Sequence, residues 1–159
     1  MVRGVQSVET SACLKHFLCN EQEVAKLESN SVVSERALRQ LYLYAFEIAI
    51  RDSDPVAIMT SYNFVNGMPA SASSDLLIGV LREEWGYDCM ITGDWNNDKD
   101  IVDEINNGNG VRQPAAFCNI DAVYAAIDSG KISRKTLLAG AEYLMRSICR
   151  MYSKNLNRI

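Results

Sequence analysis

The strongest constraint on the fold is a pattern that recurs through the first 92 residues: a short apolar run, a polar loop, then an amphipathic segment. The apolar runs lie at residues 11–17, 56–60 and 89–92. Runs of this length between turn residues predict buried strands. Residues 34–51 and 73–85 instead place apolar side chains at helical spacing. Strands that alternate with helices in this way predict an α/β fold with a parallel sheet covered by helices.

Turn and capping residues set the expected helix boundaries. Ser34 is a good N-cap, and the helix that it begins should end before Pro55, because the residue preceding proline avoids the helical region. Ser73 or Ser74 is expected to cap the second helix. Gly86 suits the left-handed position at its C-terminus.

After residue 96 the chain becomes rich in Asn, Asp and Gly, and the pattern weakens. We expect a short helix at residues 101–105, a second at residues 120–128 capped by Asn119, and a final long helix capped by Ser133. Residues 111–117 are a weak candidate for a further strand. The C-terminal third is therefore expected to be mainly helical.

Composition excludes several classes of protein. The 159 residues suit one domain, and a net charge of -4 gives no basic face for nucleic acid. No apolar run is long enough to span a membrane. With one His and five Cys but no C-x-x-C pair, a zinc site would need an unusual ligand set, so we expect no metal site. We also expect no cofactor. Free, mostly buried thiols such as Cys13 and Cys89 favour a reducing compartment, and hence the cytoplasm.

Polar residues stand at the same end of each predicted strand. Lys15 and His16 end the first, Tyr62 follows the second, and Asp94 with Trp95 follows the third. The carboxyl ends of parallel strands share one edge, so these side chains should converge. Structural roles compete with a functional one: Asp94 as a turn cap, His16 as a core histidine, Tyr62 as a packing residue, Lys15 as a surface charge.

Four sequence motifs together resemble a known family. The first runs from Lys15-His16-Phe17 through Gln22-Glu23 to residues 34–39 (SERALR). The other three are residues 61–67 (SYNFVNG), residues 76–86 (LLIGVLREEWG) and Gly93-Asp94-Trp95. In this order they resemble the barrel domain of glycoside hydrolase family 3, from about residue 10 to residue 96. The last motif stands where that family usually has S-D-W.

The resemblance implies a role for each candidate site residue. It assigns the catalytic nucleophile to Asp94. Lys15 and His16 resemble the pair that binds sugar hydroxyls, and Tyr62 resembles the tyrosine that orients the nucleophile. Trp95 would form an apolar wall of the sugar pocket.

The resemblance also implies an incomplete barrel. A (β/α)8 barrel takes about 250 residues, so residues 1–159 would be a single domain forming its C-terminal part, with three to four β-α units plus C-terminal helices. In that family the general acid usually comes from a separate domain. The implied function is retaining exo-β-glucosidase-like hydrolysis of a carbohydrate substrate, with little activity in the isolated chain.

The implied partners are the missing barrel half and the domain that carries the acid. Self-association is a further expectation, because half a barrel leaves open sheet edges. The alternative is a non-catalytic carbohydrate-binding or scaffold segment that lacks the acid/base residue.

Overall fold

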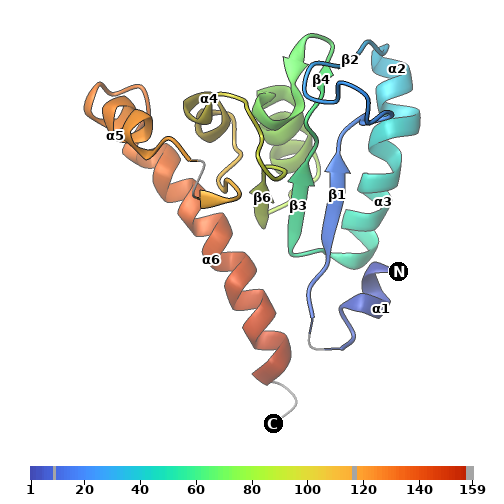
Figure 1. Ribbon diagram of the computed structural model, residues 1–159. Helices are drawn as coiled ribbons and strands as arrows, with labels where there is room; N and C mark the ends of the chain where they lie inside the picture. The colour runs from blue at the N-terminus through green and yellow to red at the C-terminus, as the bar shows by residue number, and fades with distance from the viewer. Residues whose placement is uncertain (9, 116–117, 157–159) are drawn as a thin grey trace.

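A three-stranded parallel sheet forms the centre of the protein (Figure 1). The computed structural model describes residues 1–8, 10–115 and 118–156. The strand order is β1 (Cys13–Phe17), β3 (Ala57–Thr60), β6 (Met90–Thr92). Every residue of β3 is buried, as expected for the middle strand of a covered parallel sheet. The α/β class and the parallel sheet are therefore confirmed.

Helices and short strands complete the described fold. The helices and helical turns are α1 (Val2–Val5), α2 (Glu35–Ala37), η1 (Leu38–Leu43), α3 (Tyr44–Ser53), η2 (Ala70–Ala72), η3 (Asp75–Glu84), α4 (Ile101–Asn106), α5 (Ile120–Asp128) and α6 (Arg134–Leu156). A second small sheet consists of β2 (Asn30–Ser31), β4 (Phe64–Val65) and β5 (Met68–Pro69). Because α2, η1 and α3 follow without a break, they form the one helix predicted after Ser34.

Most of the predicted caps are present. The Ser34 side chain accepts a hydrogen bond from the N–H of Ala37, and Asp54 ends α3 in the left-handed conformation. Asn119 and Ser133 cap α5 and α6 through their side-chain oxygens. Ser74 precedes η3 but makes no capping bond with its side chain. That part of the prediction is wrong, because the first turn is held by the backbone carbonyl of Ser73 instead.

The main core lies between the sheet and the helices α3 and η3. Its fully buried side chains include Phe17, Ile58 and Ile91 from the three strands and Leu77 and Leu81 from η3. A smaller cluster joins α4, α5 and the start of α6. The apolar runs and the helical spacing thus predicted the core correctly.

Two expectations about local structure need correction. Val111 forms one parallel bridge with Thr92, so the candidate strand at 111–117 is reduced to a single pair; residues 116 and 117 lie outside the described residues. All five thiols are free, but only Cys19 and Cys89 are buried. Cys13 is exposed because β1 is an edge strand whose residues alternate in exposure. No helix in the described part of the chain is long and apolar enough to cross a membrane.

Gly108 is a position where we expect a substitution to be costly. Its φ is +97°, and a Cβ atom there would lie 3.2 Å from Cγ1 of Ile78. Gly108→Ala should therefore lower the free energy of unfolding by ~1–3 kcal/mol, through backbone strain and the contact with η3. Urea unfolding measures the loss.

Gly86 provides the matched control, since its φ is +66° and a Cβ atom there would have no neighbour within 4 Å. Gly86→Ala then reports the backbone strain alone. Equal losses in the two variants would contradict a role for the contact with Ile78.

Candidate active site

The carboxyl ends of the three parallel strands bring His16, Tyr62 and Asp94 together. The Nε2 atom of His16 lies 3.2 Å from Oδ2 of Asp94. Tyr62 follows β3, and its hydroxyl donates a hydrogen bond to the backbone carbonyl of Trp95. The predicted convergence is confirmed for these three residues. His16 is not a buried core residue, because a third of its side chain is exposed.

Asp94 is held from two directions. It follows β6 and is buried, with 9% of its surface exposed. Its Oδ1 accepts a hydrogen bond of 2.7 Å from the Trp95 N–H, while Oδ2 faces His16. Asp94 does not cap the following helix, because Asp100 performs that role for α4. The carboxylate is thus fixed in orientation without serving a helix.

Tyr62 stands beside this carboxylate as a proton donor. Burial, the negative charge of Asp94 and a hydrogen bond to Asp94 raise the pKa of Tyr62 to about 12. The phenol therefore stays protonated far above neutral pH. A neutral hydroxyl can donate to a carboxylate or to a bound hydroxyl group.

We expect Tyr62 to make stability depend on pH in the alkaline range. The folded chain holds the phenol proton up to about pH 12, whereas the unfolded chain loses it near pH 10. Stability should therefore fall as pH rises from 10 towards 12, because unfolding releases a proton there. When thermal unfolding is measured from pH 9 to 12, the unfolding midpoint should fall less steeply with pH for Tyr62→Phe than for the natural chain.

Tyr62→Phe must be compared with the natural chain because burial also raises the pKa of Tyr87, so the natural pH dependence does not come from Tyr62 alone. Tyr87→Phe is the matched control. It removes a second phenol whose pKa is raised, and Tyr87 precedes β6 whereas Asp94 follows that strand. Identical pH dependence in Tyr62→Phe and the natural chain would contradict the raised pKa of Tyr62.

Lys15 and Trp95 are placed differently from the other three. The Lys15 side chain is exposed, and within the described residues it makes no hydrogen bond or ion pair with Asp94. Trp95 is 56% exposed and contacts the carboxylate through its backbone N–H. Both side chains are thus exposed to solvent.

A lysine that the sequence did not single out also lies at the site. Lys26, in the loop after β1, has its ammonium 4.8 Å from the centre of the Tyr62 ring. It also forms an ion pair of 2.8 Å with Glu23. The sequence did not predict this contact, because it depends on the path of the loop after β1 over the carboxyl ends of the strands.

A buried network supports the loop that carries Asp94. Glu104 is 2% exposed and accepts a hydrogen bond from the Asn97 side chain, and Nε of Arg112 lies 3.5 Å from its carboxylate. Burial raises the pKa of Glu104, although Ser71, Arg112 and Asn97 oppose the shift. Glu104 is therefore engaged beneath the loop and is not free to serve the open face.

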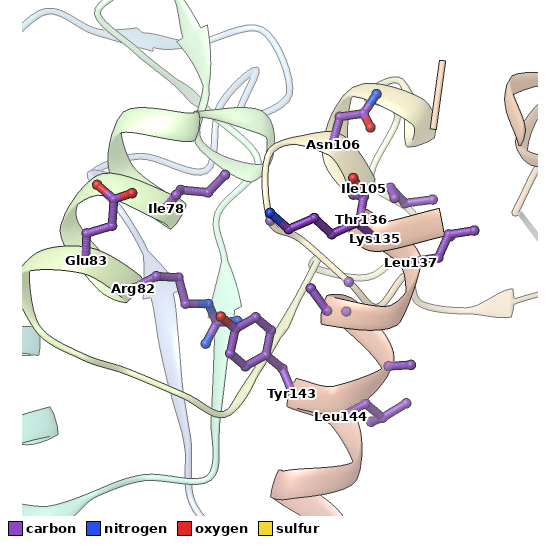
Figure 2. Close-up of a pocket in the computed structure, with 15 residues that line it drawn as sticks. Ile78, Arg82, Glu83, Ile105, Asn106, Lys135, Thr136, Leu137, Tyr143 and Leu144 are labelled. Atoms are coloured by element: carbon purple, nitrogen blue, oxygen red, sulfur yellow. The ribbon is translucent and has the colours of Figure 1, made fainter. Parts of the chain in front are cut away.

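A cavity lies elsewhere, between η3 and α6 (Figure 2). It has a volume of about 800 Å³ and is lined by Ile78, Tyr143 and Leu144 among others. Arg82 and Tyr143 also line the cavity, and the guanidinium of Arg82 lies 3.7 Å from the centre of the Tyr143 ring. None of the candidate site residues lines this cavity, so it is separate from the face that carries Asp94.

Comparison with known proteins gives a family match over most of the chain. Residues 1–146 match the model described as the glycosyl hydrolase family 3 N terminal domain. The chain is 36% identical over 152 residues to beta-glucosidase B of Emericella nidulans, covering 94% of this chain and 18% of that protein. It is 45% identical over 114 residues to a beta-glucosidase of Kluyveromyces marxianus, covering 72% of this chain and 14% of that protein.

Solved structures agree with the sequence matches. Beta-glucosidase 3B from Thermotoga neapolitana, in complex with glucose, aligns with a TM-score of 0.90 at 36% identity, covering 99% of this chain and 23% of that one. The Kluyveromyces marxianus beta-glucosidase in complex with glucose aligns with a TM-score of 0.92 at 36% identity, covering 98% of this chain and 19% of that one. The chain thus spans less than a quarter of the length of these relatives.

Proposed function

The chain belongs to glycosyl hydrolase family 3, and we propose that it supplies the nucleophile of a retaining exo-β-glucosidase. Residues 1–159 would form one domain, the C-terminal part of a (β/α)8 barrel with three to four β-α units and closing helices. The observation that carries the proposal is Asp94, held at a strand end between His16 Nε2 and the Trp95 N–H. Names of the relatives support β-glucosides as the substrate class.

The proposed chemistry proceeds in two steps. An Asp94 oxygen attacks the anomeric carbon, the glycosidic bond breaks, and a general acid gives its proton to the leaving oxygen. Water then attacks the same carbon of the glycosyl-enzyme, gives a proton to the conjugate base of that acid, and releases the Asp94 carboxylate. Two inversions give net retention of configuration.

The neighbouring residues would bind the sugar and orient the nucleophile. His16 and Lys15 can donate to sugar hydroxyls, and Tyr62 stays protonated and can donate beside Asp94. Trp95 offers an exposed aromatic face to the sugar ring. The hydrogen bond from the Trp95 N–H fixes the orientation of the carboxylate that attacks.

The general acid is proposed to come from a part of the parent protein outside this segment. Glu104 is buried beneath the loop, and Glu23 is paired with Lys26. Half of the acid/base pair is then missing from the 159 residues, which should show no hydrolysis alone.

The test places this segment in the full-length Kluyveromyces marxianus beta-glucosidase, in exchange for the segment that it matches. This chimaera should hydrolyse an aryl β-glucoside with retention of configuration, followed by NMR of the first-formed sugar. Binding of glucose by calorimetry without hydrolysis would favour the carbohydrate-binding alternative. Inverted configuration in the product would reject Asp94 as a nucleophile.

A further inference from the structure

The chain between α4 and α5 returns along the loop that carries Asp94. The Val111 carbonyl accepts a hydrogen bond of 2.9 Å from the Gly93 N–H. The Gln113 carbonyl accepts one of 3.1 Å from the Asn96 N–H. These two N–H groups lie on either side of Asp94 in the sequence. The returning chain therefore holds the backbone both before and after the proposed nucleophile.

Arg112 stands between these two carbonyl groups in the sequence, and its side chain reaches further along the same loop. Nη2 donates hydrogen bonds to the carbonyls of Asn97 and Lys99, and Nη1 donates a second bond of 2.9 Å to Lys99. These carbonyls lie three and five residues after Asp94. The planar guanidinium thus spans two carbonyls, which a single ammonium group on a flexible stem would hold less firmly.

Glu104 fixes Arg112 in this position. Only 3% of the Glu104 side chain and 12% of the Arg112 side chain are exposed, and Oε2 of Glu104 lies 3.5 Å from Nε of Arg112. The other carboxylate oxygen, Oε1, accepts a hydrogen bond from the Asn97 side chain, which also donates one of 3.0 Å to Ser71. Buried charges persist where they are paired and hydrogen-bonded, so this pair is a fixed support for the loop.

The loop supported in this way bends sharply directly after Asp94. Asn96 has a φ of +57°, in the left-handed region, and the Asn97 N–H donates a hydrogen bond of 3.3 Å to the Asp94 carbonyl. A residue other than glycine stays in that region where the surrounding structure holds it. The Asp94 carboxylate meets His16 at 3.2 Å and the Trp95 N–H at 2.7 Å. Both contacts depend on the course of this bend, so the bend decides where the carboxylate lies.

We propose that Arg112 is a positioning residue, which places the Asp94 carboxylate by holding the carbonyls of Asn97 and Lys99. The inference rests on the proposed function, in which Asp94 attacks the sugar. Arg112 itself would not touch the sugar, because its side chain is buried and its donors are directed to the loop. A displaced nucleophile loses reaction rate more than substrate affinity, so Arg112 should act on kcat and much less on KM.

The first test uses His16, the single histidine of the chain, as a probe of the carboxylate. Its imidazole gives one set of NMR signals, which depend on the Asp94 oxygen 3.2 Å away. Asp94→Asn supplies the reference spectrum without the carboxylate. Arg112→Lys keeps a positive charge beside Glu104 but removes the planar fork. At a fixed pH, the His16 signals of Arg112→Lys should therefore move towards those of Asp94→Asn.

The second test measures hydrolysis in the chimaera. Arg112→Lys should lower kcat for an aryl β-glucoside by about tenfold or more, with KM within about twofold. Glu104→Gln is the second variant in case Arg112→Lys does not fold. It keeps an acceptor for the Asn97 side chain and removes the charge that fixes Arg112. Its His16 signals and its kcat should change in the same direction.

Two controls separate positioning from a general loss of stability. Arg134→Lys makes the same change at an exposed arginine whose side chain forms no hydrogen bond or ion pair with any described residue. Ser147→Ala removes a hydroxyl that bonds to the Met90 N–H, at the opposite end of β6 from Asp94, and should lower stability. Both controls should leave the His16 signals in place and keep kcat within about twofold.

Unchanged His16 signals in Arg112→Lys would overturn the proposal, and so would equal shifts in Arg112→Lys and Ser147→Ala. Shifted signals without a loss of kcat would also overturn it, because the position of the carboxylate would then not limit the reaction. An undiminished kcat in Asp94→Asn instead rejects the proposed function. The His16 signals distinguish the two failures, since they are measured without hydrolysis.

Discussion

Replacing Asp94 by asparagine should lower kcat for an aryl β-glucoside by about 10⁴-fold or more in the chimaera, because an amide cannot form the glycosyl ester. Asparagine has nearly the same shape and can still accept the hydrogen bond from the Trp95 N–H. The fold and KM should therefore change much less than kcat. Steady-state kinetics and thermal unfolding separate these effects.

Asp98 supplies the matched control on the same loop. Asp98 lies four residues after Asp94. Its carboxylate is half exposed and pairs with Lys99. Asp98→Asn should leave kcat within about twofold, since the ion-pair partner of Asp98 is Lys99 and, among the described residues, Asp98 forms no hydrogen bond or ion pair with Asp94. Azide should also restore turnover to Asp94→Ala and give a glycosyl azide of inverted configuration. Natural activity in Asp94→Asn would remove the basis of the proposed function.

The sheet and its helices could be predicted because each is encoded over a short stretch. β3 is an apolar run between turn residues, and the helix after Ser34 repeats its apolar residues at helical spacing. The convergence of His16 and Asp94 needed one further step, the rule that parallel strands end at a common edge. None of these inferences depends on knowing the tertiary contacts.

The remaining site contacts are tertiary and left no local pattern. Glu104 lies in α4 and Arg112 lies in the loop that follows this helix, and the two side chains meet beneath the Asp94 loop. Lys26 reaches Tyr62 across 36 residues of sequence. The sequence also misplaced Cys13, because an edge strand alternates in exposure although its residues read as one apolar run. Only the folded arrangement decides such positions.

Ser147 also makes tertiary contacts that leave no pattern in the sequence, and its replacement is expected to have a large effect on stability. It lies in the middle of α6, is 1% exposed, and bridges two strands. Its hydroxyl accepts a hydrogen bond of 2.7 Å from the Met90 N–H and donates one of 2.7 Å to the Val56 carbonyl. These groups lie at the N-terminal ends of β6 and β3, so one hydroxyl attaches α6 to both strands.

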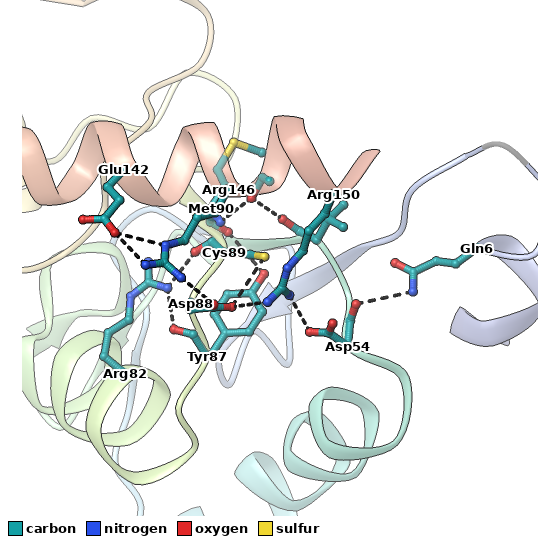
Figure 3. Close-up of polar contacts among 12 residues, drawn as sticks. Gln6, Asp54, Arg82, Tyr87, Asp88, Cys89, Met90, Glu142, Arg146 and Arg150 are labelled. Carbon is teal, nitrogen blue, oxygen red and sulfur yellow. Dashed lines mark hydrogen bonds and ion pairs between the residues drawn. The ribbon is translucent and has the colours of Figure 1, made fainter. Parts of the chain in front are cut away.

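The ion pairs around Ser147 are more conspicuous but should matter less. Figure 3 shows Arg146 and Arg150 reaching Asp88, and Arg150 also reaching Asp54. About a third or more of each of these side chains is exposed, and exposed pairs are worth ~0–1 kcal/mol. A buried donor or acceptor without a partner costs about 1–3 kcal/mol. The single neutral hydroxyl is therefore expected to outweigh the charged cluster.

Ser147→Ala should lower the free energy of unfolding by about 2–4 kcal/mol, because it leaves both the Met90 N–H and the Val56 carbonyl without their partner. The midpoint of thermal unfolding should fall by roughly 10 °C. Ser153→Ala is the control, since its exposed hydroxyl bonds, within the described part of the chain, only to the Arg150 carbonyl on the same helix. We expect a change within about 0.5 kcal/mol. A loss in Arg146→Gln that exceeds the loss in Ser147→Ala would reverse the order, and would mean that the ion pairs hold α6 to the sheet.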